Sequence, residues 1–318
     1  MGPFLLRRLA TFIATLAVAS VVVFAVLELL PGNAAQVILG DSATPESLAA
    51  MEAQLGLDRP PLERYAQWVG GWLRGETATS ISYGVPTAEL VAQRLEVTLP
   101  LALMAMAITV VVALVLGVYA AARHNKLGDV GVMAASQLGI AIPNFWFAIL
   151  LILLFAVHLQ WVNAGGFPGW RVDDGGGFWP ALQSLILPAI ALAVVQAAIL
   201  ARVTRSAVLD VLREDFVRTA RAKGLTQGQA LRRHVLRNAL IPVLTVGGLQ
   251  FANLITGTIV VESVFVLPGI GRLVFQAIAN RDLLVVRDVV MLLAALVIVV
   301  NFVVDVLVAW IDPRLRAD

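Results

Sequence analysis

Apolar residues gather into six runs along the chain, each long enough to cross the roughly 30 Å hydrocarbon core of a membrane as a helix. The first run holds 22 residues, which corresponds to about 33 Å of helix at about 1.5 Å per residue. We therefore expect it to be a retained span and not a cleaved signal peptide. The pattern predicts an all-α integral membrane protein with six transmembrane helices, at about Leu9–Leu30, Val97–Ala122, Val130–His158, Ala181–Val203, Ala239–Val264 and Val285–Trp310.

The longest hydrophilic piece, residues 31–96, separates the first two apolar runs. Thr44 followed by proline is typical of a helix start and Gly56 of a helix end, so we predict a short helix over Pro45–Leu55. A second stretch, Leu62–Leu73, repeats apolar residues at three- and four-residue spacing. That spacing predicts one apolar face, formed by Leu62, Tyr65, Trp68, Val69 and Trp72. Such a segment suits either a lid packed on the outer ends of the spans or a docking surface for an external partner.

Composition and charge agree with a membrane location and indicate its orientation. The chain is 59% hydrophobic and only 14% charged, with a mean hydropathy of +0.87 and a net charge of +2. Between Arg202 and Asn238, nine Lys or Arg accompany three acids, which gives this stretch a formal charge of +6. Because basic loops stay on the cytoplasmic face, we expect this stretch and both termini inside, and residues 31–96 outside. Topology explains the basic residues, so we expect membrane lipid and no nucleic acid as a partner.

The basic stretch also carries signals for an ordered shape. A helix-compatible run over Val208–Lys223 is followed by Gly224, which suits the left-handed conformation that ends many helices. Thr226 and Gln229 then have the spacing of a capping box at the start of another helix. Helix, glycine, cap and helix together predict a stiff elbow at the membrane surface, presented to a partner. A loop whose charges serve only membrane topology is the alternative interpretation.

Residues that enzymes use for common chemistry are missing or too far apart in this sequence. The chain contains no cysteine, which excludes disulfides and thiolate metal ligands. It has no Gly-Lys dipeptide, and hence no phosphate-binding P-loop, and no Gly-x-Ser-x-Gly motif for serine hydrolysis. The three histidines, His124, His158 and His234, lack the spacing of a zinc site. We therefore expect no enzymatic activity, no metal and no cofactor on this chain.

Polar side chains inside the apolar runs must lie against protein or water, because their exposure to lipid is costly. We expect most of them to hold helices together and three to line a translocation pathway. These three are Asn144, which follows a proline, and Gln250 and Asn253, which share one face of the fifth run. Asp305 lies deep in the last run, and we expect it to pair with a basic residue near the inner face, for which Arg202 and Arg205 are candidates.

Several motifs stand in a fixed order along nearly the whole chain. One lies in the basic stretch, at Glu214–Gly224, and one begins there and runs past its end, at His234–Pro242. The others are at Leu30–Gly32, Leu55–Asp58, Pro143–Trp146, Val260–Gly271 and Asp312–Arg314. With these motifs the chain closely resembles the permease subunits of bacterial ABC importers, in their dipeptide, oligopeptide and nickel branch. Two positions depart from the general family motif, since Arg218 replaces its glutamate and Arg237 its proline.

This resemblance implies a type I ABC importer permease, a set of partners and a role for the elbow. In that family two homologous permeases form the pore, and each inserts its elbow into an ATPase subunit, of which there are one or two. ATP and magnesium bind to those subunits, and an extracytoplasmic substrate-binding protein delivers the cargo. By position, the residues that couple to the ATPase are Arg218, Thr219, Ala220, Arg221, Lys223, Gly224, Leu225 and Thr226. After the fifth run, the residues Pro268–Gly271 predict a break of the chain into a re-entrant or surface turn at the outer mouth, so we expect an outer gate at Glu262, Pro268, Gly269 and Gly271.

Together these observations predict the permease of an ATP-driven importer of di- or oligopeptides that works by alternating access. We expect three parts, namely residues 1–30 with the first span, the outer segment 31–96, and a five-helix core over 97–318 that includes the coupling loop 204–238. Import of nickel or another small solute is the alternative within the same class. A secondary transporter is the alternative from another class, but it predicts inverted repeats and several buried carboxylates.

Overall fold

A computed structural model describes residues 2–29, 34–40, 43–173 and 175–311. Within these ranges the chain is helical, apart from one isolated bridge between Thr79 and Pro86 and the connecting loops. Five helices in the described ranges are long and apolar enough to cross a membrane. They are α1 (Gly2–Leu29), α5 (Thr87–Ala122), α8 (Phe178–Leu212), α11 (Leu236–Val264) and α13 (Leu283–Ile311). The motifs at Leu30–Gly32 and Asp312–Arg314 lie outside the described residues.

The third predicted span, Val130–His158, is not one straight helix. The helix α6 (Leu127–Ala141) meets the pair formed by α7 (Asn144–Leu151) and the π-helix η2 (Ile152–His158) at an angle of 100°. The break falls at Pro143, which lacks a backbone N–H and keeps the preceding Ile142 extended (φ −90°, ψ 122°). If the bent pair is one broken span, the described residues hold six candidate spans, as the apolar pattern predicted.

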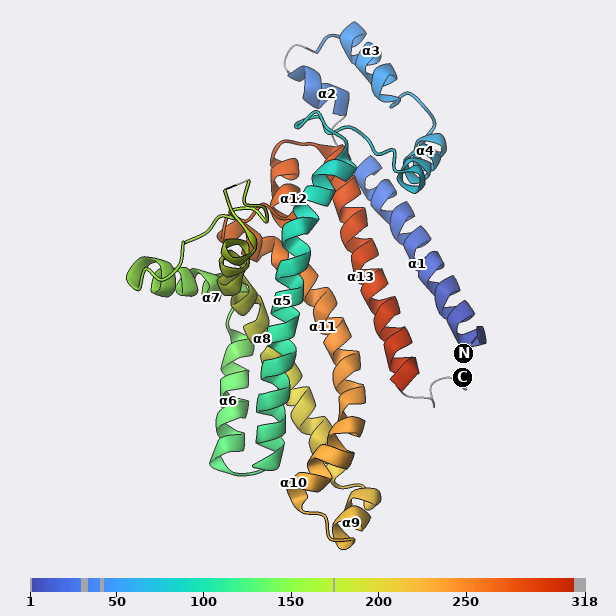
Figure 1. The fold of residues 1–318 in the computed structure, drawn as a ribbon. Coiled ribbons are helices and arrows are strands. Elements are labelled where there is room, and N and C mark those ends of the chain that lie inside the picture. The colour runs from blue at the N-terminus through green and yellow to red at the C-terminus, as the bar shows by residue number, and fades with distance from the viewer. Residues whose placement is uncertain (1, 30–33, 41–42, 174, 312–318) are drawn as a thin grey trace.

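The core of the bundle is centred on α8, which packs against α5, α6, α7 and α11, while α13 packs on α11 and α1 (Figure 1). Small residues let these helices approach closely, as in many membrane helix interfaces. A Cβ atom on Gly117 of α5 would lie 2.7 Å from the carbonyl oxygen of Ala201 on α8. A Cβ atom on Gly248 of α11 would lie 2.3 Å from a methyl group of Val304 on α13. Larger residues at either glycine would push the helices apart.

Short helices gather at the two ends of the bundle (Figure 1). At one end lie α2 (Ala34–Leu39), α3 (Pro45–Leu55), α4 (Pro61–Arg74) and α12 (Ile270–Ala279). At the other end lie α9 (Asp215–Ala222) and α10 (Gln227–Ala230), which continues through the π-helix η3 (Leu231–Val235) into α11. The basic stretch belongs to the second end, so charge assigns that end to the cytoplasm.

The helix predicted over Pro45–Leu55 is confirmed, with the boundaries that the sequence indicated. The Thr44 hydroxyl accepts a hydrogen bond from the backbone N–H of Ser47 and forms a capping box with that residue. Gly56 ends the helix in the left-handed conformation (φ 66°), and Gly75 ends α4 in the same way (φ 77°). Local capping chemistry therefore sets the limits of both outer helices.

Asp305 pairs with a basic residue as predicted, but the two candidate partners, Arg202 and Arg205, are wrong. Its carboxylate lies 2.9 Å from Nη1 of Arg8, so this ion pair connects α13 with α1. Arg205 instead donates two hydrogen bonds, of 2.6 and 2.7 Å, to Asp129 in α6. Arg8 reaches Asp305 because α1 packs along α13, an arrangement that no local pattern in the sequence indicates.

Candidate functional site

The basic stretch folds back on the end of α8 as a compact elbow. The helix α8 stops at Leu212, and Glu214 is extended (φ −67°, ψ 145°) before α9 begins. The continuous helix predicted over Val208–Lys223 is therefore wrong. The break turns the chain so that Val217 of α9 is buried in the same apolar cluster as Val208 of α8.

The turn between α9 and α10 has the predicted geometry. Gly224 adopts a φ of 97°, a conformation that glycine reaches without strain, and its N–H donates to the carbonyl oxygen of Arg221 at 3.0 Å. The backbone N–H of Gln229 donates to the hydroxyl oxygen of Thr226 at 3.3 Å. In return, the side-chain oxygen of Gln229 accepts from the N–H of Thr226 at 2.9 Å. The capping box predicted for this turn is confirmed.

Burial separates the base of the elbow from its outward surface. Val217, Ala230 and Val235 are buried and fix α9, α10 and η3 to the bundle. Among the predicted coupling residues, Ala220 and Leu225 are half-buried. The exposed ones are Arg218, Thr219, Arg221, Lys223, Gly224 and Thr226. The elbow thus presents a basic surface on an apolar base.

Phe216 belongs to the same surface, although the sequence patterns did not single it out. Its side chain is 44% exposed and lies next to the buried Val217 in the chain. An exposed aromatic ring among basic residues is typical of a surface that a partner protein covers. The sequence signal that could have identified Phe216 is a second apolar residue directly beside Val217 in a mostly polar helix.

A buried ion pair connects the turn between α5 and α6 with α8. Asp129 is 3% exposed and accepts the two hydrogen bonds from Arg205 and a third, of 2.9 Å, from the backbone N–H of Asn125. Nδ1 of His124 lies 3.4 Å from the same carboxylate. Removing either partner would leave the other without its counter-charge, so the pair holds these elements together. Across the part of the chain that the structure describes, no three His, Asp or Glu side chains gather as a metal site requires.

The three predicted pathway residues come from α7 and α11. Nδ2 of Asn253 donates to Oε1 of Gln250 at 3.3 Å. The side chain of Gln250 is buried, whereas that of Asn253 is exposed. A Cβ atom on Gly257 of α11 would lie 3.4 Å from Nδ2 of Asn144, which places that amide beside α11. Gly257 lies one helical turn beyond Asn253, on the same face. Asn144 therefore lies about one helical turn from Asn253 along the same side of α11, and we call the three amides the polar strip.

The turn between α11 and α12 is organised around Glu262, which is fully buried. Its carboxylate accepts hydrogen bonds from the hydroxyl of Thr98 on α5, at 2.6 Å, and from the N–H of Gly271, at 2.8 Å. The N–H of Ile270 donates to the same hydroxyl oxygen at 2.9 Å. Glu262 and Thr98 thus satisfy the first backbone donors of α12. Sequence reasoning missed Thr98, because 164 positions separate it from Glu262.

At two positions in this turn, neighbouring atoms come so close to the backbone that only glycine fits. A Cβ atom on Gly269 would lie 2.2 Å from the carboxyl carbon of Glu262, and one on Gly271 would lie 2.2 Å from Cα of Ile259. Pro268, which has no N–H to continue a helix, directly precedes them. The four residues predicted for the outer gate are therefore neighbours in one tight turn, and their role as a gate stays a prediction.

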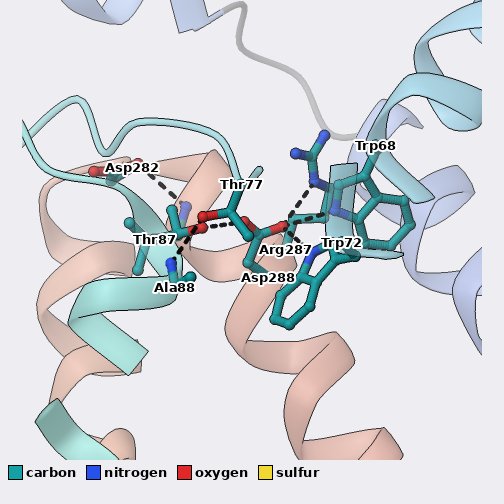
Figure 2. A network of polar contacts seen from close by, with 9 residues as sticks. Trp68, Trp72, Thr77, Thr87, Ala88, Asp282, Arg287 and Asp288 are labelled. Atoms are coloured by element: carbon teal, nitrogen blue, oxygen red, sulfur yellow. Dashed lines mark hydrogen bonds and ion pairs between the residues drawn. The ribbon is translucent and has the colours of Figure 1, made fainter. Parts of the chain in front are cut away.

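Buried carboxylates fasten the outer segment to the start of α13 (Figure 2). Asp288 is fully buried and accepts hydrogen bonds from the indole N–H groups of Trp68, at 2.7 Å, and Trp72, at 3.2 Å. It also accepts from the hydroxyl of Thr87 at the start of α5. The guanidinium carbon of Arg287 lies 4.8 Å from the ring centroid of Trp68. This cluster ties α4, α5 and α13 together, and no sequence motif indicated it.

The two outer helices differ in how they meet the bundle. The chain between α4 and α5 is held by Asp282, which accepts from the hydroxyl of Ser80 at 2.6 Å and from the N–H of Ser82 at 3.0 Å. The predicted apolar face of α4 is covered at Trp68, whereas Leu62 at its start is 79% exposed. In contrast, α3 packs on α2 and lies farther from the spans (Figure 1). The outer segment therefore has one anchored helix and one that stands away from the bundle.

Comparison with known proteins agrees with this arrangement. Residues 1–113 match the N-terminal part of binding-protein-dependent transport system membrane components. Residues 113–317 match the family described as binding-protein-dependent transport system inner membrane component. The two matches together span nearly the whole chain.

Individual relatives are similar over the full length. The chain is 40% identical, over 333 aligned residues and 99% of both chains, to the di/tripeptide transport system permease protein DppB of Pseudomonas aeruginosa. It is 35% identical, over 336 residues and 99% of both chains, to the dipeptide transport system permease protein DppB of Escherichia coli. Its fold is similar to a chain of the inward-facing MetNI methionine ABC transporter, with a TM-score of 0.58 and 20% identity over 71% of this chain and 97% of that chain. The chain therefore belongs to the binding-protein-dependent transport system inner membrane components, the multi-pass permeases of ABC transporters, whose ATPase activity lies on other subunits.

Proposed function

We propose that this chain is the permease subunit of a peptide importer and forms half of the translocation pathway beside a second, homologous permease. The observation that carries the proposal is the similarity over 99% of the chain to permeases named for di/tripeptide and dipeptide transport. One or two ATPase subunits bind at the elbow, and a substrate-binding protein delivers peptides at the opposite end. The ATPase subunits thus act on the cytoplasmic end of the bundle, and the peptide enters at the outer end.

The elbow is suited to transmit force from an ATPase to the spans. Its outward residues include Phe216, Arg218 and Arg221, and its inner residues are buried in the bundle. Because α8 leads into the elbow and α11 leaves it, a displacement of the elbow moves both spans. The pair of Asp129 and Arg205 passes the same displacement to the turn between α5 and α6. Closure of the ATPase subunits on ATP then opens the spans toward the binding protein, as alternating access requires.

The polar strip of Asn144, Gln250 and Asn253 supports a pathway for peptides beside α11. Amide groups both donate and accept hydrogen bonds, so they can pair with a peptide backbone whatever its side chains are. The turn that contains Glu262, Pro268, Gly269 and Gly271 controls the outer mouth of this pathway. Its contacts with Thr98 make that control depend on how α5 and α11 are placed relative to each other.

The cargo is tested by purifying the complete complex with its binding protein and identifying the retained ligand by mass spectrometry. We expect di- or oligopeptides, and the same peptides should enter proteoliposomes in an ATP-dependent manner. Retention of nickel or of another small solute, without peptide uptake, would contradict the peptide assignment and favour the alternative within the same transporter class.

Replacing Gly224 with valine should uncouple the complex. A β-branched residue at a φ of 97° carries a penalty of at least about 1 to 2 kcal/mol, which distorts the turn between α9 and α10. We expect substrate-stimulated ATPase activity to be lost while membrane insertion is normal. Gly228→Val is the matched control, because Gly228 is exposed with an ordinary φ and open space around it. Wild-type stimulation of the ATPase activity by substrate in the Gly224→Val variant would contradict the coupling role of the elbow.

A further inference from the structure

Two adjoining cavities lie at the outer end of the bundle, between the start of α5, α12 and the loop before α8. They share Arg94 and Pro268 in their walls. The smaller cavity has a volume of about 200 Å³ and is bounded on α12 by Arg272 and on the preceding turn by Gly269. The larger cavity has a volume of about 730 Å³ and is bounded on the loop by Trp170. We name the two together the outer arginine cavity.

Positive charge dominates the outer arginine cavity. Three guanidinium groups, those of Arg94, Arg171 and Arg272, belong to its walls. The acid in its wall is Glu96, which is exposed. Glu262 lies behind the wall, but hydrogen bonds from α5 and α12 already engage its carboxylate. The cavity therefore attracts an anion.

Arg94 holds a donor that is unpaired among the residues that the structure describes. Its Nε atom is buried, and no acceptor among the described residues lies within hydrogen-bonding distance of it. Buried N–H groups are normally paired, and leaving one unpaired is costly, especially on a charged group. Arg272, by contrast, donates a hydrogen bond of 3.1 Å to the carbonyl oxygen of Val266. Because Arg94 belongs to both cavity walls, and no hydrogen bond or ion pair with another described residue holds its guanidinium group, this side chain is available to an acceptor in the cavity.

The remaining walls are aromatic and polar. The ring centroids of Phe167 and Trp170 lie 5.4 Å apart in an edge-to-face arrangement. The indole N–H of Trp170 donates to the carbonyl oxygen of Glu96 at 2.7 Å, which fixes this wall to α5. Gln93 and Gln276 add amide groups. Small-molecule sites of about 300 to 1,000 Å³ combine apolar walls with a few polar groups in this way, so the cavity suits a small ligand with one anionic end.

We propose that the outer arginine cavity binds the C-terminal carboxylate of the transported peptide as the peptide passes from the binding protein into the pathway. This inference rests on the proposed peptide import. A guanidinium group donates two parallel hydrogen bonds to a carboxylate, a geometry that arginine offers and lysine does not. The peptide side chains lie against Phe167 and Trp170. Since Pro268 and Gly269 form part of the wall, the carboxylate binds directly at the proposed outer gate.

Protection from chemical labelling tests the site without the binding protein. The chain has no cysteine, so Gln93→Cys places a single thiol in the cavity wall. In the assembled complex, millimolar alanyl-alanine should slow alkylation of this thiol several-fold, whereas alanyl-alanine amide, which lacks the carboxylate, should not. Adding Arg94→Gln should remove the protection. Equal protection by the two probes, or protection by neither, overturns the proposal.

Transport provides an independent measurement in proteoliposomes that contain the whole complex. Arg94→Gln should lower the initial rate of alanyl-alanine uptake by about tenfold, which corresponds to about 1.4 kcal/mol. Arg171→Gln should lower it as well, and it alters an exposed loop residue whose loss does not threaten folding. Arg59→Gln removes an exposed arginine elsewhere in the outer segment and should leave the rate unchanged. Wild-type rates in both cavity variants overturn the proposal.

Two further outcomes separate this site from neighbouring explanations. If Arg94→Gln weakens the affinity of the complex for the binding protein, the guanidinium contacts an acidic side chain of that protein, and the carboxylate site is overturned. If the wild-type complex carries no peptide, the proposed function itself fails. Equal peptide uptake by wild type and Arg94→Gln leaves peptide import intact and overturns only the site.

Discussion

At the scale of single residues, Val266 shows the clearest backbone strain. Its φ of 56° lies in the left-handed region, which β-branched residues avoid. The N–H of Leu267 donates to the carbonyl oxygen of Glu262 at 2.8 Å, and the N–H of Val266 to that of Ser263 at 3.3 Å. This pattern ends many helices, usually with glycine where this chain has valine. The hydrogen bonds that Glu262 makes with Thr98, Gly271 and Leu267 hold the strained residue in place.

Val266→Gly should therefore raise the stability of the purified complex by up to about 1 kcal/mol, because glycine adopts this conformation without a steric penalty. Thermal unfolding followed by intrinsic fluorescence would show a higher midpoint. Val260→Gly is the matched control, since Val260 is an exposed valine inside α11, where the same change should lower stability. A lower midpoint for Val266→Gly would contradict the assignment of strain to this residue.

At the scale of elements, boundaries set by local chemistry could be predicted, and boundaries set by packing could not. The caps at Thr44, Gly56 and Thr226 involve partners a few positions away, so the sequence displays them. Pro143 is also visible, but the angle of 100° depends on how α6 and α7 each pack on α8. The break before α9 contains no proline or glycine and follows from the burial of Val217.

The anchor of the outer segment can be tested at the same scale with Asp288→Ala. The change leaves three donors, from Trp68, Trp72 and Thr87, without their acceptor, at a cost of about 1 to 3 kcal/mol each. We expect α4 to detach, with amide hydrogen exchange over Pro61–Arg74 at least tenfold faster in the variant complex. The exposed Asp58 gives the control, since Asp58→Ala should exchange like wild type. Unchanged protection of α4 in Asp288→Ala would refute the anchor.

At the scale of the whole molecule, the apolar runs and the basic stretch predicted the protein class and orientation, because both are properties of long windows of sequence. Pairings between distant elements could not be predicted in this way. Three contacts join helices that meet only after folding. They are Thr98 with Glu262, Arg8 with Asp305, and Trp68 with Asp288. Family resemblance indicated the outer turn, but the reason for its glycines required the positions of the surrounding atoms.

The outer segment offers a different helix for each of its two predicted roles, and this difference leads to a test. The helix α4 packs on α13 as a lid would, whereas α3 stands on α2 away from the spans and is available to a docked protein (Figure 1). Replacing Pro45–Leu55 with a Gly/Ser linker of equal length should weaken binding-protein affinity about tenfold, or about 1.4 kcal/mol, and leave the anchor intact. An unchanged Kd in reconstituted complexes would assign the whole segment to the lid role.

The turn around Glu262 also limits how this permease can acquire a new specificity. One added methyl group at Gly269 or Gly271 overlaps the carboxylate or the backbone of α11, so substitutions there disrupt folding before they can alter selectivity. Gln93 and Gln276 border open volume instead, and a change in their size or charge meets little packing resistance. Substitutions that adapt the permease to new cargo, in evolution or by design, are therefore expected in the cavity wall and not in the adjoining turn.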